Sequence, residues 1–143
     1  MNKLTLNAIK AAFPLVLKST HGWVFIPAGD ILYLTAEDKY ARLTCLNGST
    51  LVLFHSLADL EVRLACGTRI GDLLFVRTHR SCIAAMHHAR VLPPKGGIEL
   101  ASGQVLPLSR GARTELLRIM GSLHSAARAV RAAVLLLVGN LLH

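Results

Sequence analysis

The sequence predicts a mostly β domain with short helices, followed by a helical C-terminal tail. Short apolar runs recur between Gly, Asn, Asp and Ser residues, which is typical of strands joined by tight turns. Two segments and the tail change to helical spacing. Hydrophobic residues make up 52% of the 143 residues and charged residues 17%, a balance that excludes a disordered chain and allows a buried core.

The first strands are expected to form hairpins. Two apolar runs within residues 15–26 flank His21-Gly22, where we expect the first turn. Residues 30–54 contain a second pair of strands, and the polar residues 37–39 are predicted to form a loop. Asn47-Gly48 predicts a type I′ hairpin, because that turn needs a positive φ at both central residues.

A short helix is predicted after Ser56. Leu57, Leu60 and Leu64 would share one helical face, with Ser56 as the N-cap and Gly67 as the terminating residue.

The next elements alternate again. Residues 73–76 predict a short buried strand, and residues 83–89 predict one or two helical turns. Residues 96–108 predict a hairpin that turns at Ser102-Gly103. Helical spacing then returns, with Ser109 as the expected N-cap.

The sequence divides into a short extension at residues 1–12, a domain at residues 13–120 and an apolar helical tail at residues 121–143. Residues 132–142 carry no charge, yet this run is shorter than the ~18 apolar residues expected of a spanning helix. The tail is compatible with packing on its own domain, with a homodimer, or with contact to a membrane or a membrane-protein regulator. One stripe of the tail is apolar throughout: Leu123, Ala127, Val130, Val134, Leu137 and Leu141.

The charge balance favours a polyanion. The formal net charge is +8 and is carried mostly by arginine, which binds phosphates and guanine edges in a forked geometry. Cys45, Cys66 and Cys82 have no CxxC spacing, so neither a disulfide framework nor a zinc site is expected. We expect a cytoplasmic protein without a signal peptide and without a cofactor.

Residues 73–88 concentrate polar groups that could serve three kinds of site. A metal site would use His79, His87 and His88, but zinc needs three or four converging ligands and this spacing does not provide them. A catalytic pair would join Cys82 to His79, but a Cys among apolar neighbours is more often buried and inert. We therefore expect neither an enzyme nor a small-molecule substrate.

The third kind of site binds an anion. Arg77, His79 and Ser81 alternate along an extended segment, and Arg80 falls where the strand should turn. Arg110 and Arg113 follow the expected cap of a helix, where free N–H groups favour phosphate. Each arginine alone is compatible with an ordinary surface position. Together with Lys39, Arg42 and the net charge, they favour nucleic acid.

The order of motifs resembles the LytTR family of bacterial DNA-binding domains. The blocks are "DILYLTAEDKYARL", "NGSTLVLFHSLADLEVRL", "FVRTHRSCIA" and "GGIELASGQVLPLSR", and the resemblance covers residues 15–120. The positions that carry it are Ile31, Tyr33, Ala36, Tyr40, Leu57, Leu60, Phe75, Arg77, His79, Arg80, Ser81, Gly103, Pro107, Ser109 and Arg110.

The resemblance implies an elongated β-sandwich of small sheets, whose loops enter successive major grooves at direct repeats in promoters. By position, it assigns Lys39, Arg80 and Arg110 to base edges. It assigns Arg77, Ser81, Ser109 and Arg113 to phosphates, whereas His79 is either packed or a DNA contact. Tyr33, Tyr40, Phe75 and Leu57 are expected in the core.

The chain also departs from the family pattern. Ala85 stands where the family often carries Asn, and Thr78 replaces an apolar residue. Many family members carry an N-terminal receiver domain, and residues 1–12 are too few to form one. We therefore expect no regulation by phosphorylation of a receiver within this chain.

Overall fold

The computed structural model describes residues 14–93 and 96–142. Its elements, in chain order, are β1 (Pro14–Ser19), β2 (Gly22–Pro27), η1 (Ala28–Asp30), β3 (Ile31–Glu37), β4 (Tyr40–Cys45), β5 (Thr50–Leu53), α2 (Leu57–Arg63), β6 (Phe75–His79), β7 (Cys82–Ala85), η2 (Met86–His88), β8 (Ala89–Val91), β9 (Ile98–Leu100), β10 (Val105–Leu106) and α3 (Arg110–Leu142). The expected extension at residues 1–12 lies outside the described residues.

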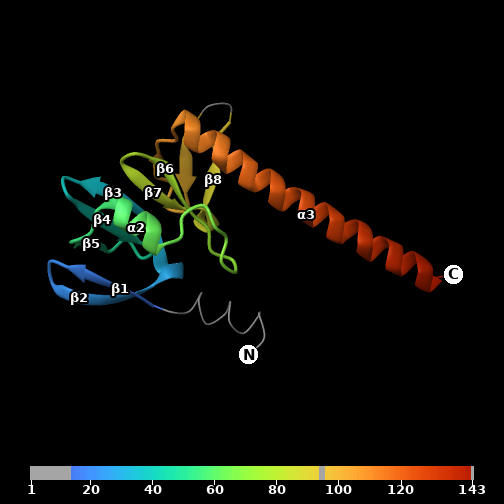
Figure 1. Cartoon of the computed structure of the whole chain (residues 1–143), viewed down its shortest axis with the longest axis horizontal. Coiled ribbons are helices and arrows are strands. Elements are labelled where there is room, and N and C mark those ends of the chain that lie inside the picture. The colour runs from blue at the N-terminus through green and yellow to red at the C-terminus, as the bar shows by residue number, and fades with distance from the viewer. Residues whose placement is uncertain (1–13, 94–95, 143) are drawn as a thin grey trace.

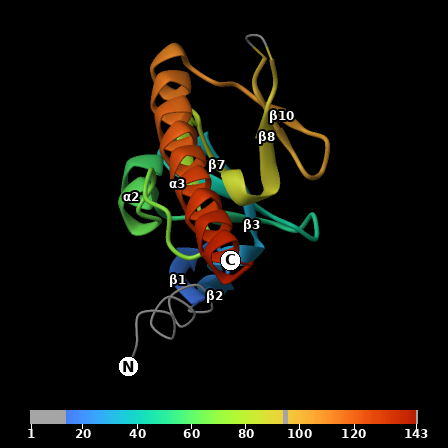
Figure 2. The same ribbon diagram turned by 90° about the vertical axis from the view of Figure 1, so that its right-hand side faces the viewer.

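Two antiparallel sheets form the domain, which confirms the mostly β prediction. The larger sheet has the strand order β2-β1-β5-β4-β3-β7-β6, and the smaller has the order β10-β9-β8. Helix α2 packs on one face of the larger sheet, while the smaller sheet and the first turns of α3 cover the other face (Figure 1). The view in Figure 2 shows α3 in front of the sheet, between α2 and the strands β8 and β10.

The hydrophobic core consists of two clusters, one on each face of the larger sheet. Leu57 and Leu60 of α2 lie in the first cluster, and Leu116 of α3 lies in the second. Successive strand residues alternate between the clusters, because successive side chains of a strand point to opposite faces. Phe75 joins the first cluster and Val76 the second.

Strand β7 contradicts the predicted helical turns at residues 83–89. Cys82–Ala85 is a strand between β3 and β6, and a single 3-10 turn follows at Met86–His88. All four residues of β7 are buried, so the strand shows no polar alternation. A continuous apolar run of this kind is compatible with either a strand or a buried helix. The neighbouring β6 is also longer than the predicted strand and reaches His79.

The predicted hairpins are confirmed, with corrections to their turns. β1 and β2 turn at Thr20-His21, one residue earlier than expected. The predicted polar loop is shorter than expected, since β3 runs to Glu37 and only Asp38-Lys39 forms the turn. The β4–β5 turn is not type I′, because Gly48 has a positive φ of 87° and Asn47 does not.

Residues 98–106 form the hairpin that was predicted at residues 96–108. It turns at Ser102-Gly103, where Gly103 has a φ of 88°. Among the expected core residues, Leu57 and Phe75 are buried, whereas Tyr33 and Tyr40 are partly exposed.

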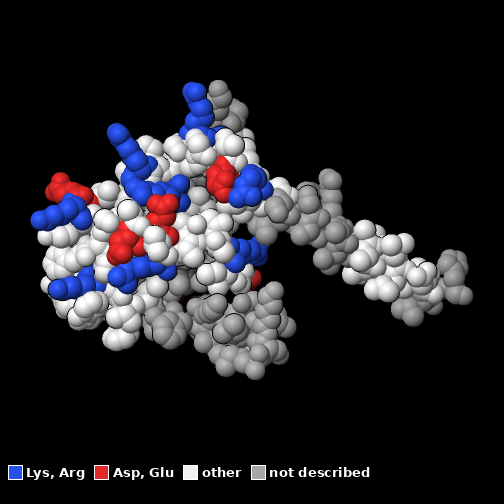
Figure 3. Space-filling view, in the orientation of Figure 1, with Lys and Arg blue, Asp and Glu red and all other residues white. Residues whose placement is uncertain are grey.

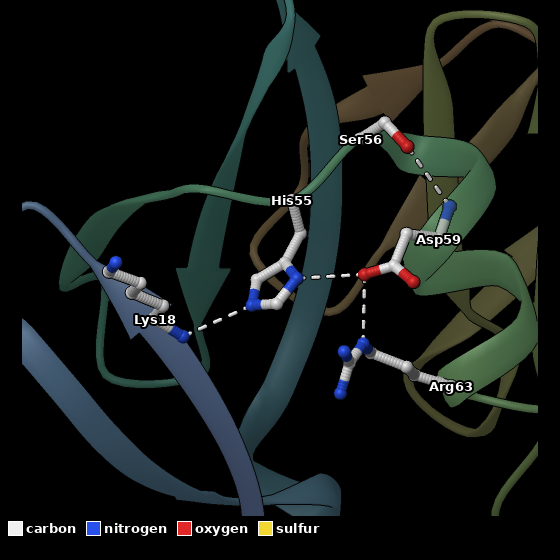
Figure 4. Close-up of polar contacts among 5 residues, drawn as sticks. All are labelled: Lys18, His55, Ser56, Asp59 and Arg63. Carbon is white, nitrogen blue, oxygen red and sulfur yellow. Dashed lines mark hydrogen bonds and ion pairs between the residues drawn. The ribbon is translucent and has the colours of Figure 1, made fainter.

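Helix α2 begins at the predicted cap and is tied to the first hairpin. The Ser56 hydroxyl accepts a hydrogen bond from the Asp59 N–H at 3.1 Å. The helix ends at Arg63, earlier than the predicted stop at Gly67. His55 Nε2 accepts from the Lys18 N–H at 3.1 Å, and Nδ1 lies 2.7 Å from the Asp59 carboxylate (Figure 4). This imidazole therefore links β1 to α2.

Helix α3 begins in the domain and continues beyond it. Ala112 N–H donates to the Ser109 hydroxyl at 3.2 Å, which confirms the predicted N-cap. The helix runs without a break through the predicted boundary at residue 120, and its C-terminal part extends away from the sheets (Figure 1). Among the described residues, no helix has the length and apolar character needed to cross a membrane.

Candidate nucleic-acid interface

Three segments that each carry an exposed cation meet at one end of the larger sheet. They are the β3–β4 turn, the β6–β7 turn and the start of α3. Thr35 of β3 pairs with Cys82 of β7, and the Ala36 N–H donates to the Ser81 carbonyl at 2.8 Å, so the first two turns are neighbours. The Ser109 N–H donates to the Thr78 carbonyl at 2.7 Å, which places the start of α3 beside β6.

Each segment carries one exposed cation that was predicted from the sequence. Lys39 lies in the β3–β4 turn, Arg80 in the β6–β7 turn and Arg110 in the first turn of α3. Lys39 Nζ lies 5.5 Å from the centre of the Tyr40 ring. The side chains of Arg80 and Arg110 make no hydrogen bond or ion pair to another described residue. All three cations are therefore accessible to an anionic ligand.

Arg77 is half-buried and is held by two contacts. Its Nη1 donates to Glu61 Oε2 of α2 at 2.8 Å, and its Nη2 donates to the Arg80 carbonyl at 2.8 Å. One guanidinium thus connects α2 to the β6–β7 turn. Because the second contact is to the backbone of Arg80, it restrains the turn that presents the Arg80 side chain.

His79 and Ser81 form a local hydrogen-bond pair across the same turn. The Ser81 N–H donates to His79 Nδ1 at 3.2 Å, and the Ser81 hydroxyl lies 2.8 Å from the same nitrogen. Since Nδ1 accepts from the backbone, the neutral ring carries its proton on Nε2. Both residues are half-buried, so this contact shapes the turn.

Thr78 holds the start of α3 through its carbonyl, which accepts from the Ser109 N–H. The Thr78 side chain is fully buried, and its hydroxyl lies 3.1 Å from Cys82 Sγ. The departure from the family pattern at Thr78 is therefore accommodated by a hydrogen bond. Arg113 donates to the Gly96 carbonyl, which ties the helix to the loop before β9. Arg113 is half-buried, whereas Arg110 is exposed.

His79 and Cys82 were the two residues of the catalytic alternative, and each forms its hydrogen bond with another residue. His79 and Cys82 pair across the β6–β7 turn, but His79 bonds to Ser81 and Cys82 bonds to Thr78. Burial raises the pKa of the Cys82 thiol, which favours the less nucleophilic protonated form. In the described ranges, no three His, Cys, Asp or Glu side chains come together as a metal site.

Two acidic residues of this region were not identified from the sequence. Glu61 pairs with Arg77 across 16 positions of the chain, a separation that leaves no local pattern. Glu37 pairs with Arg42 at 2.9 Å, and the hydrogen bond to Glu37 raises the pKa of Arg42. The Glu37–Arg42 pair could have been predicted from the register of the β3–β4 hairpin, because Arg42 lies opposite Thr35, two residues from Glu37.

The small antiparallel sheets define a β-rich domain, and the comparisons with known proteins identify its family as one of DNA-binding domains. The model of the LytTr DNA-binding domain matches residues 21–121. A solved LytTr DNA-binding domain from Bacillus cereus is similar, with a TM-score of 0.60 and 25% sequence identity. That match covers 76% of this chain and 97% of the other. No curated protein matches. The chain belongs to the LytTR DNA-binding domain family.

Proposed function

We propose that this chain is a transcriptional regulator that binds double-stranded DNA sequence-specifically, with its turns in successive major grooves of direct repeats. The observation that carries the proposal is the grouping of three exposed cations, Lys39, Arg80 and Arg110, at one end of the larger sheet. Turns that project from a sheet end can enter a major groove, and arginine there recognises guanine by two hydrogen bonds. The cytoplasm of a bacterium is the setting in which such a protein would act.

The remaining residues are proposed to position the protein on the phosphates. Arg77 uses two of its five N–H donors internally, so donors remain for a phosphate oxygen. Ser109 accepts the helix-cap hydrogen bond, and its own O–H is left to donate. Ser81 and Arg113 complete this set, and His79 contributes mainly by holding Ser81. Phosphate contacts of this kind fix the register of the protein without reading sequence.

The test is the binding of purified protein to a promoter-derived duplex with paired direct repeats, measured by fluorescence anisotropy against a random duplex. We expect a preference for the repeats. Arg80→Ala and Arg110→Ala should each cost about 1–3 kcal/mol on the repeats and relax that preference. Arg69→Ala is the matched control, because Arg69 precedes β6 and lies away from the turn at its other end. Equal losses for all three variants would contradict the proposed roles.

A second candidate function is favoured by the C-terminal part of α3. Its residues 134–138 are apolar and exposed, so they are available to a partner. The chain would then act as an interaction module that docks on a second subunit or on a membrane-protein regulator. This function is compatible with DNA binding, because the two surfaces are at different places on the molecule.

A further inference from the structure

Helix α3 is packed against the domain near its start and is exposed toward its C-terminus. Leu116 and Ile119 are 1% and 8% exposed and pack against the second core cluster. Val134, Leu135, Leu136, Leu137 and Val138 are 47–70% exposed. The side chains of residues 122–130 lie outside the described set. An apolar helix surface of this size in water is stabilised when another surface covers it.

The sequence of α3 contains a strict seven-residue repeat. Apolar residues alternate four and three positions apart from Leu116 to Leu141, which is the a/d pattern of a coiled coil. The d positions are Leu116, Leu123, Val130 and Leu137, and the a positions are Met120, Ala127, Val134 and Leu141. The same stripe that packs α3 on its domain at Leu116 therefore continues along the exposed part of the helix.

We propose that a second copy of this chain covers the stripe and that the two α3 helices form a parallel two-stranded coiled coil. The seam of this coiled coil consists of the a and d positions from Met120 onward. A second copy fits because a heptad stripe is complementary to itself, and a β-branched residue at a with leucine at d favours two parallel strands, as Val134 and Leu137 provide.

The absence of charge in the last turns of the helix favours the same partner. Residues 132–142 contain no charged side chain, so two copies do not repel each other there. The same run offers no ionic group to a charged partner. A helix that lies on a membrane surface generally has a strongly basic face, and this run has none.

A parallel arrangement places both DNA-binding domains at the same end of the coiled coil. If the chain binds repeated DNA sites as proposed above, the linked pair gains affinity because the second domain binds at a raised effective concentration. The assembly itself is inferred from α3 alone. Its failure can therefore be distinguished from a failure of DNA binding.

The first experiment compares two double variants of the full chain by multi-angle light scattering. Val134→Asp with Leu137→Asp changes the seam, whereas Leu135→Asp with Leu136→Asp changes equally exposed residues outside it. We expect the wild type and the second variant to have twice the mass of one chain, and the seam variant to have the mass of one chain. Circular dichroism checks that both variants keep the folded domain.

A second experiment tests the direction of the helices. In a parallel pair, Val134 meets Val134 of the other copy, so Val134→Cys should form a disulfide-linked dimer on oxidation. Leu136→Cys and the wild type, with its native thiols, are the controls and should not. A monomeric wild type, or equal loss of dimer in both Asp variants, would overturn the proposal. Binding of the monomer to vesicles of phosphatidylglycerol and phosphatidylcholine that both Asp pairs abolish would overturn it in favour of a membrane.

Discussion

At the scale of single residues, Arg77 connects the fold to the proposed interface. Its guanidinium bonds both to Glu61 of α2 and to the Arg80 carbonyl in the β6–β7 turn. Glu61 therefore restrains the turn through Arg77. Replacing Glu61 therefore tests the position of the β6–β7 turn without removing a cation from the proposed interface.

We predict that Glu61→Ala weakens binding to the specific duplex by about 0.5–1 kcal/mol, which is a few-fold in Kd, because exposed ion pairs contribute in this range. Binding to random DNA should not weaken, because that binding depends on phosphate contacts and the net charge rises. Glu115→Ala is the control, since Glu115 also pairs with an arginine, Arg118, but lies on α3 away from the turn. Anisotropy titrations on both duplexes measure the effect, and an equal change for the two variants would contradict the positioning role.

His87 gives a prediction about pH. Its ring packs edge-on against Phe75 with centroids 5.1 Å apart, and its Nδ1 lies 3.1 Å from the Leu74 N–H donor. Burial, followed by the charge of His88, lowers the pKa of His87 below its ordinary 6.5. The folded state then resists protonation, while the unfolded chain takes up a proton as the pH falls through this value. The contribution of His87 to the free energy of unfolding is therefore fully present above pH 6.5, and it is lost progressively as the pH falls below this value.

We predict that the melting temperature falls between about pH 7.5 and about pH 5.5, and that His87→Gln shows a smaller fall. Thermal unfolding followed by circular dichroism measures both. His21→Gln, which changes an exposed histidine in the β1–β2 turn, serves as the control. The same pH dependence in His87→Gln and in the wild type would show that another group is responsible.

The residue scale also shows what sequence can and cannot supply. The sequence placed Arg80 in a turn and Ser109 at a helix cap, because both positions follow from local signals. It could not supply the Arg77–Glu61 pair or the link from His55 to Lys18. These contacts join residues far apart in the chain, so they depend on how the elements pack.

At the scale of elements, Ser109 caps the start of α3 and, as proposed, also donates a hydrogen bond to a phosphate. Asp is as good an N-cap as Ser, but its carboxylate would repel a phosphate. We predict that Ser109→Asp keeps the free energy of unfolding and loses most DNA affinity. Ser109→Ala should lose about 1 kcal/mol of stability, because the Ala112 N–H loses its acceptor.

Chemical denaturation and DNA titration of the two Ser109 variants measure this separation. Ser102→Asp introduces the same charge in the β9–β10 turn and controls for the change in net charge. If Ser109→Asp bound DNA as tightly as Ser102→Asp, Ser109 would not lie near a phosphate.

The elements that sequence predicted well are those with a polar side. Helix α2 buries Leu57 and Leu60 while its exposed side carries Asp59 and Arg63, so its period is visible. Strand β7 is buried on both faces, and its period was hidden by uniformly apolar residues. The prediction of helical turns there was wrong for this reason. The family resemblance supplied the sheet architecture, which local periodicity does not determine.

At the scale of the whole molecule, charge is unevenly distributed. Lys and Arg side chains are scattered over the visible face of the domain, several of them beside acidic side chains, while the visible surface of the far part of α3 is uncharged (Figure 3). Arg42, Arg63, Arg90 and Arg118 all have carboxylate partners. Net charge alone therefore does not identify the interface, because partnered arginines contribute to the +8 as much as accessible ones do.

The most direct measurement is the salt dependence of binding to the specific duplex for two triple variants with the same net charge. One replaces Lys39, Arg80 and Arg110 with Ala, and the other replaces Arg69, Arg90 and Arg118. Wild-type affinity should fall steeply with salt, by about 0.9 in log–log slope for each phosphate neutralised. We predict that the first variant loses its preference for the specific duplex but keeps the part of the slope that comes from the phosphate-binding Arg77 and Arg113, while the second variant keeps both the preference and the slope. Equal losses in the two variants would show that overall charge, and not the turns at the end of the larger sheet, binds the DNA.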